Sequence, residues 1–298
     1  MRVGIMVLPE LRWSAAIERW QAVETLGFDS AWTYDHLWWR ALRDGPWFGT
    51  FPLLAAAACA TTRIRLGTLV TSPNFRHPVP TAKDAITIDD VSGGRFTLGV
   101  GAGSTGAGDA NVIDTKVLGP GERVERFAEF VGLLDRLLRQ PVTTHHGRYF
   151  TADEARTIPG CVQQPRLPIA VAATGPRGMA IAARHGDAWV TCGPADVSRS
   201  YRPEEFLAEV RRQADAFSRE CERIGRSAAA VDRILVTTDM TGDLLAAPEV
   251  FVEYAERYAA IGVTDLVVHW PRESGVYAGE RRALEAVAEK ALPHVHCL

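Results

Sequence analysis

The stretch "TLGVGAGSTGAGD", residues 97–109, decides between two folds. Within it, residues 101–106 match the dinucleotide-binding fingerprint G-x-G-x-x-G, and they follow a strand-like run at 95–100. That fingerprint needs a helix directly after the glycines and an acidic residue about 20 positions later, at the tip of a second strand. Here no helical period appears before Pro120, and the acidic residues at that spacing fall inside the helix that starts there. A dinucleotide-binding fold is therefore disfavoured.

The bulk properties describe an ordinary globular protein. The chain has 298 residues, of which 47% are hydrophobic and 23% are charged, and its formal net charge is −3. This charge gives no reason to expect nucleic acid as a partner. The sequence has no apolar run of about 18 residues and no signal-peptide pattern, so we expect a cytoplasmic protein without a membrane partner.

The sequence offers no recognisable metal site. The five cysteines are scattered and never spaced as C-x-x-C, which indicates reduced thiols. The one histidine pair, His145-His146, lies in what we interpret as a polar, solvated turn without acidic residues at ligand spacing. We expect the protein to bind no metal.

Short apolar runs alternate with amphipathic segments along the chain. The runs are not interrupted by polar residues, as expected for parallel strands that are covered on both faces. Strands are predicted at 2–8, 30–34, 64–71, 96–100, 168–172, 187–191, 233–239 and 264–269. Helices are predicted at about 14–26, 51–60, 80–91, 121–139, 177–185, 203–224, 248–261 and 278–291.

This alternation predicts an α/β fold, a (β/α)8 or TIM barrel, formed by residues 1–298 as a single domain. An open doubly wound sheet is the alternative, because the number of strands alone does not prove that the sheet closes. Residues 140–167, between the fourth helix and the fifth strand, are predicted to form a surface insertion. The loops that follow the strands would meet at one end of the barrel, where barrel enzymes build their active sites.

The second predicted strand ends in an Asp-His pair that is flanked by aromatic residues. Asp35 could fix the tautomer of the His36 ring and leave the other ring nitrogen free to exchange a proton. Trp38 and Trp39 would exclude water from the surroundings of that ring. We group Trp39 with Asp35 and His36 as candidate catalytic residues. In the structural alternative, the histidine caps the loop and the tryptophans belong to the core.

The fifth predicted strand is followed by a helix start that suits an anion. Thr174 or Gly175 fits the N-cap, and Pro176 fits the first helical position. The free backbone amides, the helix dipole and Arg177 would together attract the phosphate group of a cofactor. Every helix start has such amides, so an ordinary helix cap is the alternative.

Several short motifs follow one another along most of the chain. They are Trp-x-x-Asp-His at 32–36, Gly-Thr-x-Val-Thr-x-Pro at 67–73, Arg-His-Pro at 76–78, Ser-Gly-Gly-Arg at 92–95, Leu-Gly-Val-Gly-Ala-Gly at 98–103, Pro-Gly-Glu-Arg at 120–123, Ala-Thr-Gly-Pro-Arg at 173–177 and His-Gly-Asp-Ala-Trp at 185–189. In this order they resemble the luciferase-like monooxygenase superfamily, which binds FMN or the deazaflavin coenzyme F420 in a (β/α)8 barrel. The glycines of the opening stretch then resemble the cofactor loop of that superfamily.

The resemblance implies roles for particular residues. His36 is similar to the residue at the reactive ring in the F420-dependent branch, with Asp35 beside it. A cis peptide bond is implied between Leu69 and Val70. The sequence departs from the family at Ser104, where some F420-dependent enzymes carry a catalytic glutamate. The implied cofactor-binding residues are Leu69, Val70, Thr71, Gly101, Ala102, Gly103, Ser104, Ala173, Thr174, Gly175, Pro176 and Arg177.

The resemblance implies an oxidoreductase that transfers hydride between coenzyme F420 and a small organic substrate, with His36 as proton donor or acceptor. The alternative in the same family is an FMN-dependent monooxygenase that uses O2 and reduced flavin from a partner reductase. The resemblance also implies a homodimer. An aromatic or apolar substrate is indicated by Trp38, Trp39, Trp47, Phe48 and Trp270.

Two further alternatives lie outside this family's chemistry. A barrel hydrolase or isomerase of a phosphorylated substrate would need carboxylates at the strand ends, where only Asp35 and Asp239 qualify. A protein that binds the cofactor without catalysis would lack a substrate-sized space beside the ring.

Overall fold

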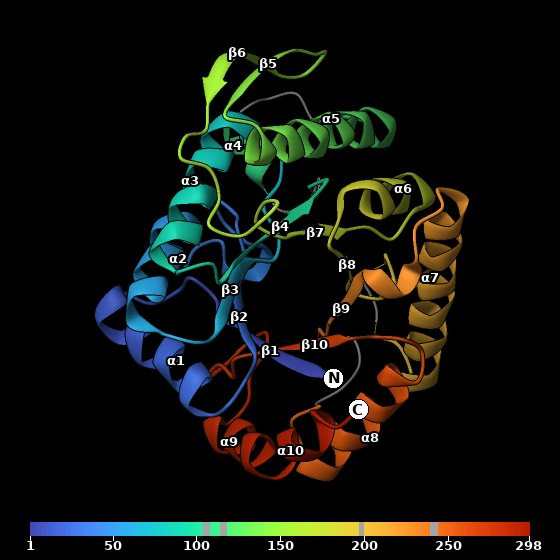
Figure 1. Ribbon diagram of the computed structural model, residues 1–298. Helices are drawn as coiled ribbons and strands as arrows, with labels where there is room; N and C mark the ends of the chain where they lie inside the picture. The colour runs from blue at the N-terminus through green and yellow to red at the C-terminus, as the bar shows by residue number, and fades with distance from the viewer. Residues whose placement is uncertain (104–107, 114–117, 197–199, 239–243) are drawn as a thin grey trace.

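The fold is a closed barrel of parallel strands surrounded by helices (Figure 1). The computed structural model describes residues 1–103, 108–113, 118–196, 200–238 and 244–298. The strands close in the order β1-β10-β9-β8-β7-β4-β3-β2. The predicted (β/α)8 barrel is therefore confirmed, and the alternative of an open sheet is wrong.

The observed elements coincide with the predicted ones apart from their ends. The barrel strands are β1 (Arg2–Met6), β2 (Ser30–Thr33), β3 (Arg65–Thr68), β4 (Phe96–Gly101), β7 (Ile169–Ala172), β8 (Ala188–Thr191), β9 (Asp232–Val236) and β10 (Asp265–His269). The long helices are α1 (Trp13–Thr25), α2 (Thr50–Ala60), α3 (Pro78–Val91), α5 (Pro120–Arg139), α6 (Pro176–His185), α7 (Pro203–Arg223), α8 (Pro248–Ala259) and α9 (Arg281–Lys290). Some predicted strands were too long because the apolar sequence continues into the loops that follow them.

Sequence patterns missed several short elements. A helical turn, α4 (Asp109–Ile113), lies in the stretch where no helix was expected, because a helix this short shows no period. The insertion at 140–167 is confirmed and contains the antiparallel hairpin of β5 (Val142–His146) and β6 (Thr151–Arg156), at the top of Figure 1. The short helices η1 (Arg40–Leu42), η2 (Ala228–Ala230) and α10 (Leu292–Val295) were also not predicted.

The histidine pair of the insertion was assigned wrongly. Both histidines belong to strand β5 and not to a turn. The His145 Nε2 atom lies 3.2 Å from a carboxylate oxygen of Glu129 on α5. Glu129 also accepts hydrogen bonds from the backbone amides of Tyr149 and Phe150. This carboxylate therefore fastens the hairpin to the barrel.

One large side chain, Trp32 on β2, fills the interior of the barrel. The residue is 4% exposed, and its indole nitrogen donates to the Ser30 hydroxyl at 2.8 Å. A Cβ atom on Gly4 would lie 2.9 Å from the indole nitrogen, and one on Gly67 would lie closer still to the nearest atom of the ring. These two strand positions must therefore be glycine. The interior is packed, which leaves open space only beyond the strand ends.

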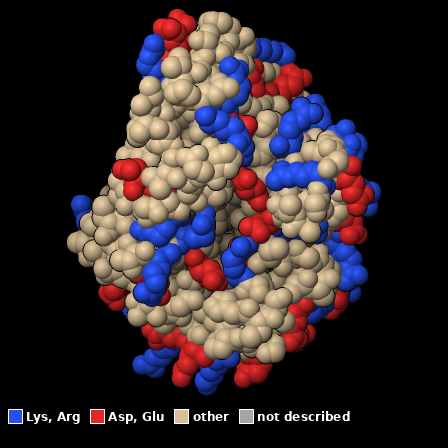
Figure 2. Space-filling view, in the orientation of Figure 1, with Lys and Arg blue, Asp and Glu red and all other residues tan. Residues whose placement is uncertain are grey.

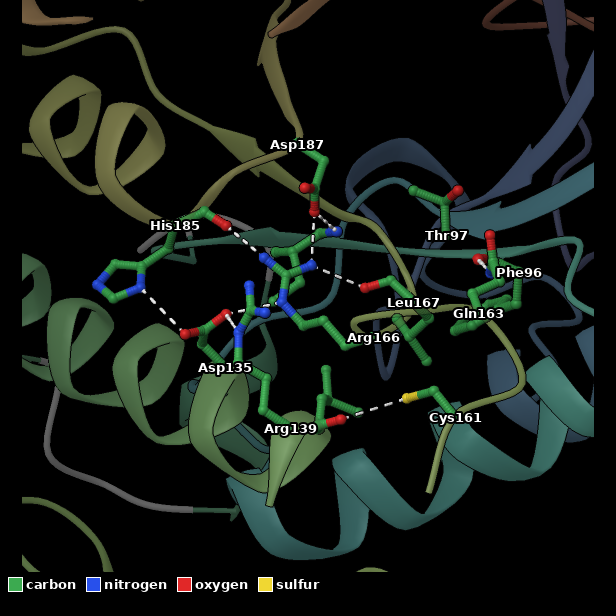
Figure 3. Close-up of polar contacts among 12 residues, drawn as sticks. Phe96, Thr97, Asp135, Arg139, Cys161, Gln163, Arg166, Leu167, His185 and Asp187 are labelled. Atoms are coloured by element: carbon green, nitrogen blue, oxygen red, sulfur yellow. Dashed lines mark hydrogen bonds and ion pairs between the residues drawn. The ribbon is translucent and has the colours of Figure 1, made fainter. Parts of the chain in front are cut away.

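The N-terminal end of the barrel, where the strands begin, is held by a buried arginine (Figure 3). Arg166, just before β7, donates to Asp135 of α5 at 2.7 Å and to Asp187 before β8 at 2.5 Å. Its Nη1 also donates to the Leu167 carbonyl oxygen, and its Nη2 donates to the His185 carbonyl oxygen. Its side chain is 3% exposed. Each nitrogen of this guanidinium group therefore has an acceptor within the fold.

The surface carries charges of both signs. Figure 2 shows basic and acidic side chains interspersed over the face in view. Some of them form ion pairs, such as Arg2 with Asp232 at 2.7 Å. Among the described helices, none has both the length and the apolar character needed to cross a membrane.

Candidate active site

A cavity of about 840 Å³ lies at the C-terminal mouth, the end of the barrel where the strands finish. Residues that follow β2, β3, β4, β7, β8 and β9 contribute to its lining. Of the predicted site residues that the structure describes, His36, Trp39, Leu69, Val70, Gly101, Ala102, Gly103 and the segment 173–177 line this cavity. Ser104 and Asp239 lie outside the described residues.

One wall of the cavity is the turn after β3, packed on the glycines after β4. The peptide bond between Leu69 and Val70 is cis, as expected. A Cβ atom on Gly101 would lie 2.6 Å from the Val70 side chain, and Gly103 has a positive φ of 79° with the Asn74 side chain against it. Gly101 and Gly103 of the opening stretch are therefore required by this contact between two loops.

Two predicted site residues lie behind that wall and do not reach the cavity. Asp35 has no exposed surface and forms an ion pair with Arg76 at 2.7 Å. It also accepts a hydrogen bond from the Thr71 hydroxyl at 2.5 Å. The expectation that Asp35 orients His36 is therefore not met. Asp35 instead ties the end of β2 to the loop that follows β3.

The partner of His36 is Asp109, which sequence analysis missed. The His36 Nδ1 atom lies 2.7 Å from Asp109 Oδ2, and the backbone amide of Leu37 donates to Oδ1 at 2.8 Å. Asp109 has no exposed surface, and the side chain of His36 is 15% exposed. A carboxylate on Nδ1 selects the tautomer that leaves Nε2 free. His36 Nε2 is therefore the nitrogen left to exchange a proton in the cavity.

Aromatic side chains form a second wall beside His36. Trp39 lies with its ring centroid 5.4 Å from that of Tyr34 and 5.9 Å from that of Tyr277. The Tyr34 ring meets the His36 ring edge-on, with centroids 6.1 Å apart. We call Tyr34, Trp39 and Tyr277 the aromatic wall. It gives the cavity an aromatic surface next to the candidate catalytic histidine.

A buried histidine holds this wall from behind. The Tyr34 hydroxyl lies 2.7 Å from Nε2 of His269, and the Tyr277 and His269 rings stack with centroids 3.5 Å apart. Burial lowers the pKa of His269 to about 3, so the ring is neutral at pH 7. Burial also raises the pKa of Tyr34 well above its usual value, with a further contribution from Tyr277. A neutral hydroxyl and a neutral ring therefore share this hydrogen bond, and the tautomer of His269 sets which of them donates.

The other aromatic residues expected to form the substrate wall lie elsewhere. The Trp38 ring stacks under Arg43 and contacts Gly108. Trp47 donates from its indole nitrogen to the His36 carbonyl oxygen at 2.8 Å, which fixes the backbone of that residue. Phe48 is 38% exposed, whereas Trp270 is buried in the core between strands and helices. Only Trp39 of this group lines the cavity.

Two helix N-termini meet at one end of the cavity. Helix α6 begins at Pro176 with Gly175 as its N-cap residue, which settles the choice between Thr174 and Gly175. Helix α5 begins at Pro120. Both prolines line the cavity. Helix N-termini carry unpaired amides and a partial positive charge, so this end attracts anions.

Arginines add to the positive charge at this end. Arg123 of α5 and Arg177 of α6 both line the cavity, and no Asp or Glu occurs among its described lining residues. Arg123 donates to the Gly103 carbonyl oxygen at 3.1 Å, but its Nε is buried with no hydrogen-bond partner in the described structure. A buried N–H group without an acceptor and an arginine without a nearby carboxylate both favour the binding of a phosphate. The residues present therefore fit a flavin-type cofactor with a phosphate arm.

Comparisons with known proteins identify the family of this chain. The model of the family "Luciferase-like monooxygenase" matches residues 1–239. The chain is 30% identical over 316 aligned residues to the F420-dependent glucose-6-phosphate dehydrogenase of Beutenbergia cavernae, covering 91% of this chain and 90% of that protein. It is 36% identical over 183 residues to the 4-hydroxyprotoasukamycin monooxygenase of Streptomyces nodosus subsp. asukaensis, covering 58% of this chain and 47% of that protein.

Among solved structures, the coenzyme F420-dependent tetrahydromethanopterin reductase of Methanopyrus kandleri aligns with a TM-score of 0.76 at 19% identity, over 99% of both chains. At this identity the likeness shows the fold alone. The family match shows more than the fold. It spans most of the chain and includes all the motifs from residue 32 to 189. This chain belongs to the luciferase-like monooxygenase family and is an oxidoreductase of that family.

Proposed function

We propose that the protein binds coenzyme F420 in the 840 Å³ cavity and transfers hydride between this cofactor and a small organic substrate. The observation that carries the proposal is the His36–Asp109 pair, which presents a free imidazole nitrogen beside an aromatic wall. The F420-dependent relative from Beutenbergia cavernae, similar over nine-tenths of both chains, supports the choice of cofactor.

The chain would hold the cofactor at two places. The phosphate would lie at the N-terminus of α6, near Arg177 and the unpaired Nε of Arg123. The flat ring would rest on the turn of Leu69 and Val70, which lines the same cavity. When bound, the deazaflavin supplies the hydride chemistry, and the protein supplies orientation and electrostatics.

His36 would move the proton. With Nδ1–H donated to Asp109, the neutral ring can accept a proton at Nε2 from a substrate hydroxyl. In the reverse direction, the protonated ring returns that proton to the substrate oxygen. The buried Asp109 carboxylate stabilises the imidazolium in both directions. The Leu37 amide holds the carboxylate in place.

One relative favours a second function. The similarity to a monooxygenase over 58% of this chain is compatible with an FMN-dependent enzyme that uses O2. That function would require a partner reductase. The partner reductase, the homodimer and the single domain at 1–298 all stay predictions. The same phosphate end of the cavity would serve FMN.

Titration of the purified protein with F420 and with FMN, followed by cofactor fluorescence, tests the proposal. We expect F420 to bind at least about tenfold more tightly than FMN, a difference of about 1.4 kcal/mol. Tight FMN binding without F420 binding would instead support the monooxygenase. If neither cofactor binds, both proposals are wrong.

A further inference from the structure

A second cavity of about 370 Å³ adjoins the first, beyond the ends of β9 and β10. Apolar groups make up slightly more than half of its lining, and the aliphatic side chains among them include Leu244, Val268, Val276 and Ala283. The polar lining residues include Glu280 at the start of α9. A carboxylate at this position disfavours an anionic occupant, whereas the aliphatic side chains suit a neutral, apolar group.

The ring of Tyr277 stands between the two cavities and lines both of them. Its φ of 61° is a left-handed conformation, which is costly for a bulky residue and persists only where the surroundings enforce it. Stacking on His269 and the contact of its hydroxyl with that of Tyr34 at 3.4 Å hold the ring. Such backbone strain indicates that the position of the Tyr277 ring between the two cavities has a function.

The loop that carries Tyr277 is built to keep this position. The backbone amide of Arg272 donates to the Tyr277 carbonyl oxygen, and the amide of Gly279 donates back to the carbonyl oxygen of Arg272. The Arg272 guanidinium donates to the Val276 carbonyl oxygen and forms an ion pair with Glu10 at 2.9 Å. The loop is thus closed on itself and fastened to the segment after β1.

We propose that the second cavity is a substrate subsite that takes a neutral apolar chain or ring, while the reacting group of the same substrate lies by the aromatic wall. Tyr277 sets the width of the passage between the two. At about 30 Å³ for each water-sized group, the subsite has room for about a dozen non-hydrogen atoms. The inference rests on the proposed function, because it assumes that the substrate reacts in the larger cavity.

Straight-chain alcohols are suitable probes, because they differ only in apolar length. Calorimetric titration of the F420-loaded protein with butan-1-ol and octan-1-ol should show octan-1-ol binding about tenfold or more tightly, since each added methylene group is buried. Equal affinities, or no binding of either alcohol up to its solubility limit, would overturn the subsite.

Variants at Ala283 locate the apolar tail. Ala283→Phe fills the second cavity from α9, so it should reduce the advantage of octan-1-ol to less than about threefold and leave butan-1-ol unaffected. Ala283→Leu, which is easier to accommodate, should give an intermediate advantage. Ala286→Phe on the same helix is the matched control, because Ala286 does not line the cavity, and it should preserve the wild-type ratio. A full advantage in Ala283→Phe would place the tail elsewhere and refute the proposal.

A failure of the subsite proposal can be distinguished from a failure of the proposed function. Cofactor titration of the same variants should give wild-type affinity for F420, because Ala283 does not line the larger cavity. If the wild-type protein binds no cofactor, the proposed function fails. The alcohol series is also measured on cofactor-free protein, so the subsite is still decided by the chain-length ratio in Ala283→Phe.

Discussion

The two ends of strand β7 use arginine in opposite ways. Arg166 precedes the strand and donates to two carboxylates and two carbonyl oxygens, with 3% of its side chain exposed (Figure 3). Arg177 follows the strand and lines the large cavity, where no described residue is acidic. A buried charge whose counter-ions lie inside the fold makes the fold depend on that partnership, whereas a charge without a nearby anion is available to a ligand. We therefore assign a stabilising role to Arg166 at the N-terminal end of the barrel and propose a binding role for Arg177 at the mouth.

The strongest test of this division is His36→Asn at the mouth. The asparagine amide can still donate to Asp109, but the nitrogen that faces the cavity is lost. Turnover should fall about 10²- to 10⁴-fold, while the free energy of unfolding and the affinity for the cofactor stay close to wild type.

Steady-state kinetics, a urea unfolding curve and a cofactor titration on the same preparation check this prediction. His146→Ala on strand β5 is the control for loss of an exposed histidine, and its turnover should be unchanged. A fully active His36→Asn enzyme would remove the proton-transfer role from this residue.

For Arg166→Met at the N-terminal end, we expect a loss of stability instead of a specific loss of turnover. The substitution leaves the carboxylates of Asp135 and Asp187 without their buried partner, which should cost about 3–5 kcal/mol of unfolding free energy. Arg139→Gln removes a more exposed partner of the same Asp135, so it should cost less than about 1 kcal/mol. Urea unfolding measures both, and similar losses in the two variants would contradict the division.

A moderate, ligand-specific effect is expected for Arg177→Gln. The affinity for FMN should fall roughly 10- to 100-fold, because a charge-assisted hydrogen bond to phosphate is lost. The affinity for riboflavin, which has no phosphate, should not change. Arg184→Gln in the last turn of α6 is the matched control and should bind both flavins as the wild type does. Equal losses for FMN and riboflavin would mean that Arg177 does not meet the phosphate.

The last comparison concerns pH and separates the two ends again. The pKa of His269 is lowered by burial from 6.5 to about 3, so the unfolded chain binds a proton below pH 6.5 that the folded protein refuses. Its contribution to stability is complete above pH 6.5 and is lost as the pH falls toward 3, by at most about 1.4 kcal/mol per pH unit. The free energies of unfolding of wild type and His269→Gln should therefore differ less at pH 4 than at pH 7, because only the wild type loses this contribution as the pH falls.

The N-terminal end should respond only to stronger acid. Burial raises the pKa of Asp135, but the hydrogen bonds from His185, Arg166 and Arg139 outweigh this and hold that pKa below its usual value. Its contribution is therefore complete above about pH 4 and is lost below it. An Arg166→Met variant whose deficit already shrinks between pH 7 and 5 would contradict this account.

The fold and the local parts of the site could be predicted from sequence. Unbroken apolar runs predicted the strands, because both faces of each strand are covered. Gly175 and Pro176 predicted the start of α6, because a helix cap depends on a few neighbouring residues. The hairpin of β5 and β6 escaped, because its exposed strands carry no apolar run.

The sequence by itself determined the alternation of strands and helices and the strand end at which His36 follows β2, since each depends on local pattern or on chain order. That the sheet closes into a barrel was shown by the structure. Only the tertiary structure decided which carboxylate serves that histidine. Asp35 is its neighbour in the chain but turns to Arg76, and Asp109, 73 residues away from His36, takes the place beside it. Likewise Arg166 and Arg177 look alike as sequence, and their roles differ because only folding places carboxylates around the first. Partnership between charged groups depends on distance in space, which no local pattern specifies.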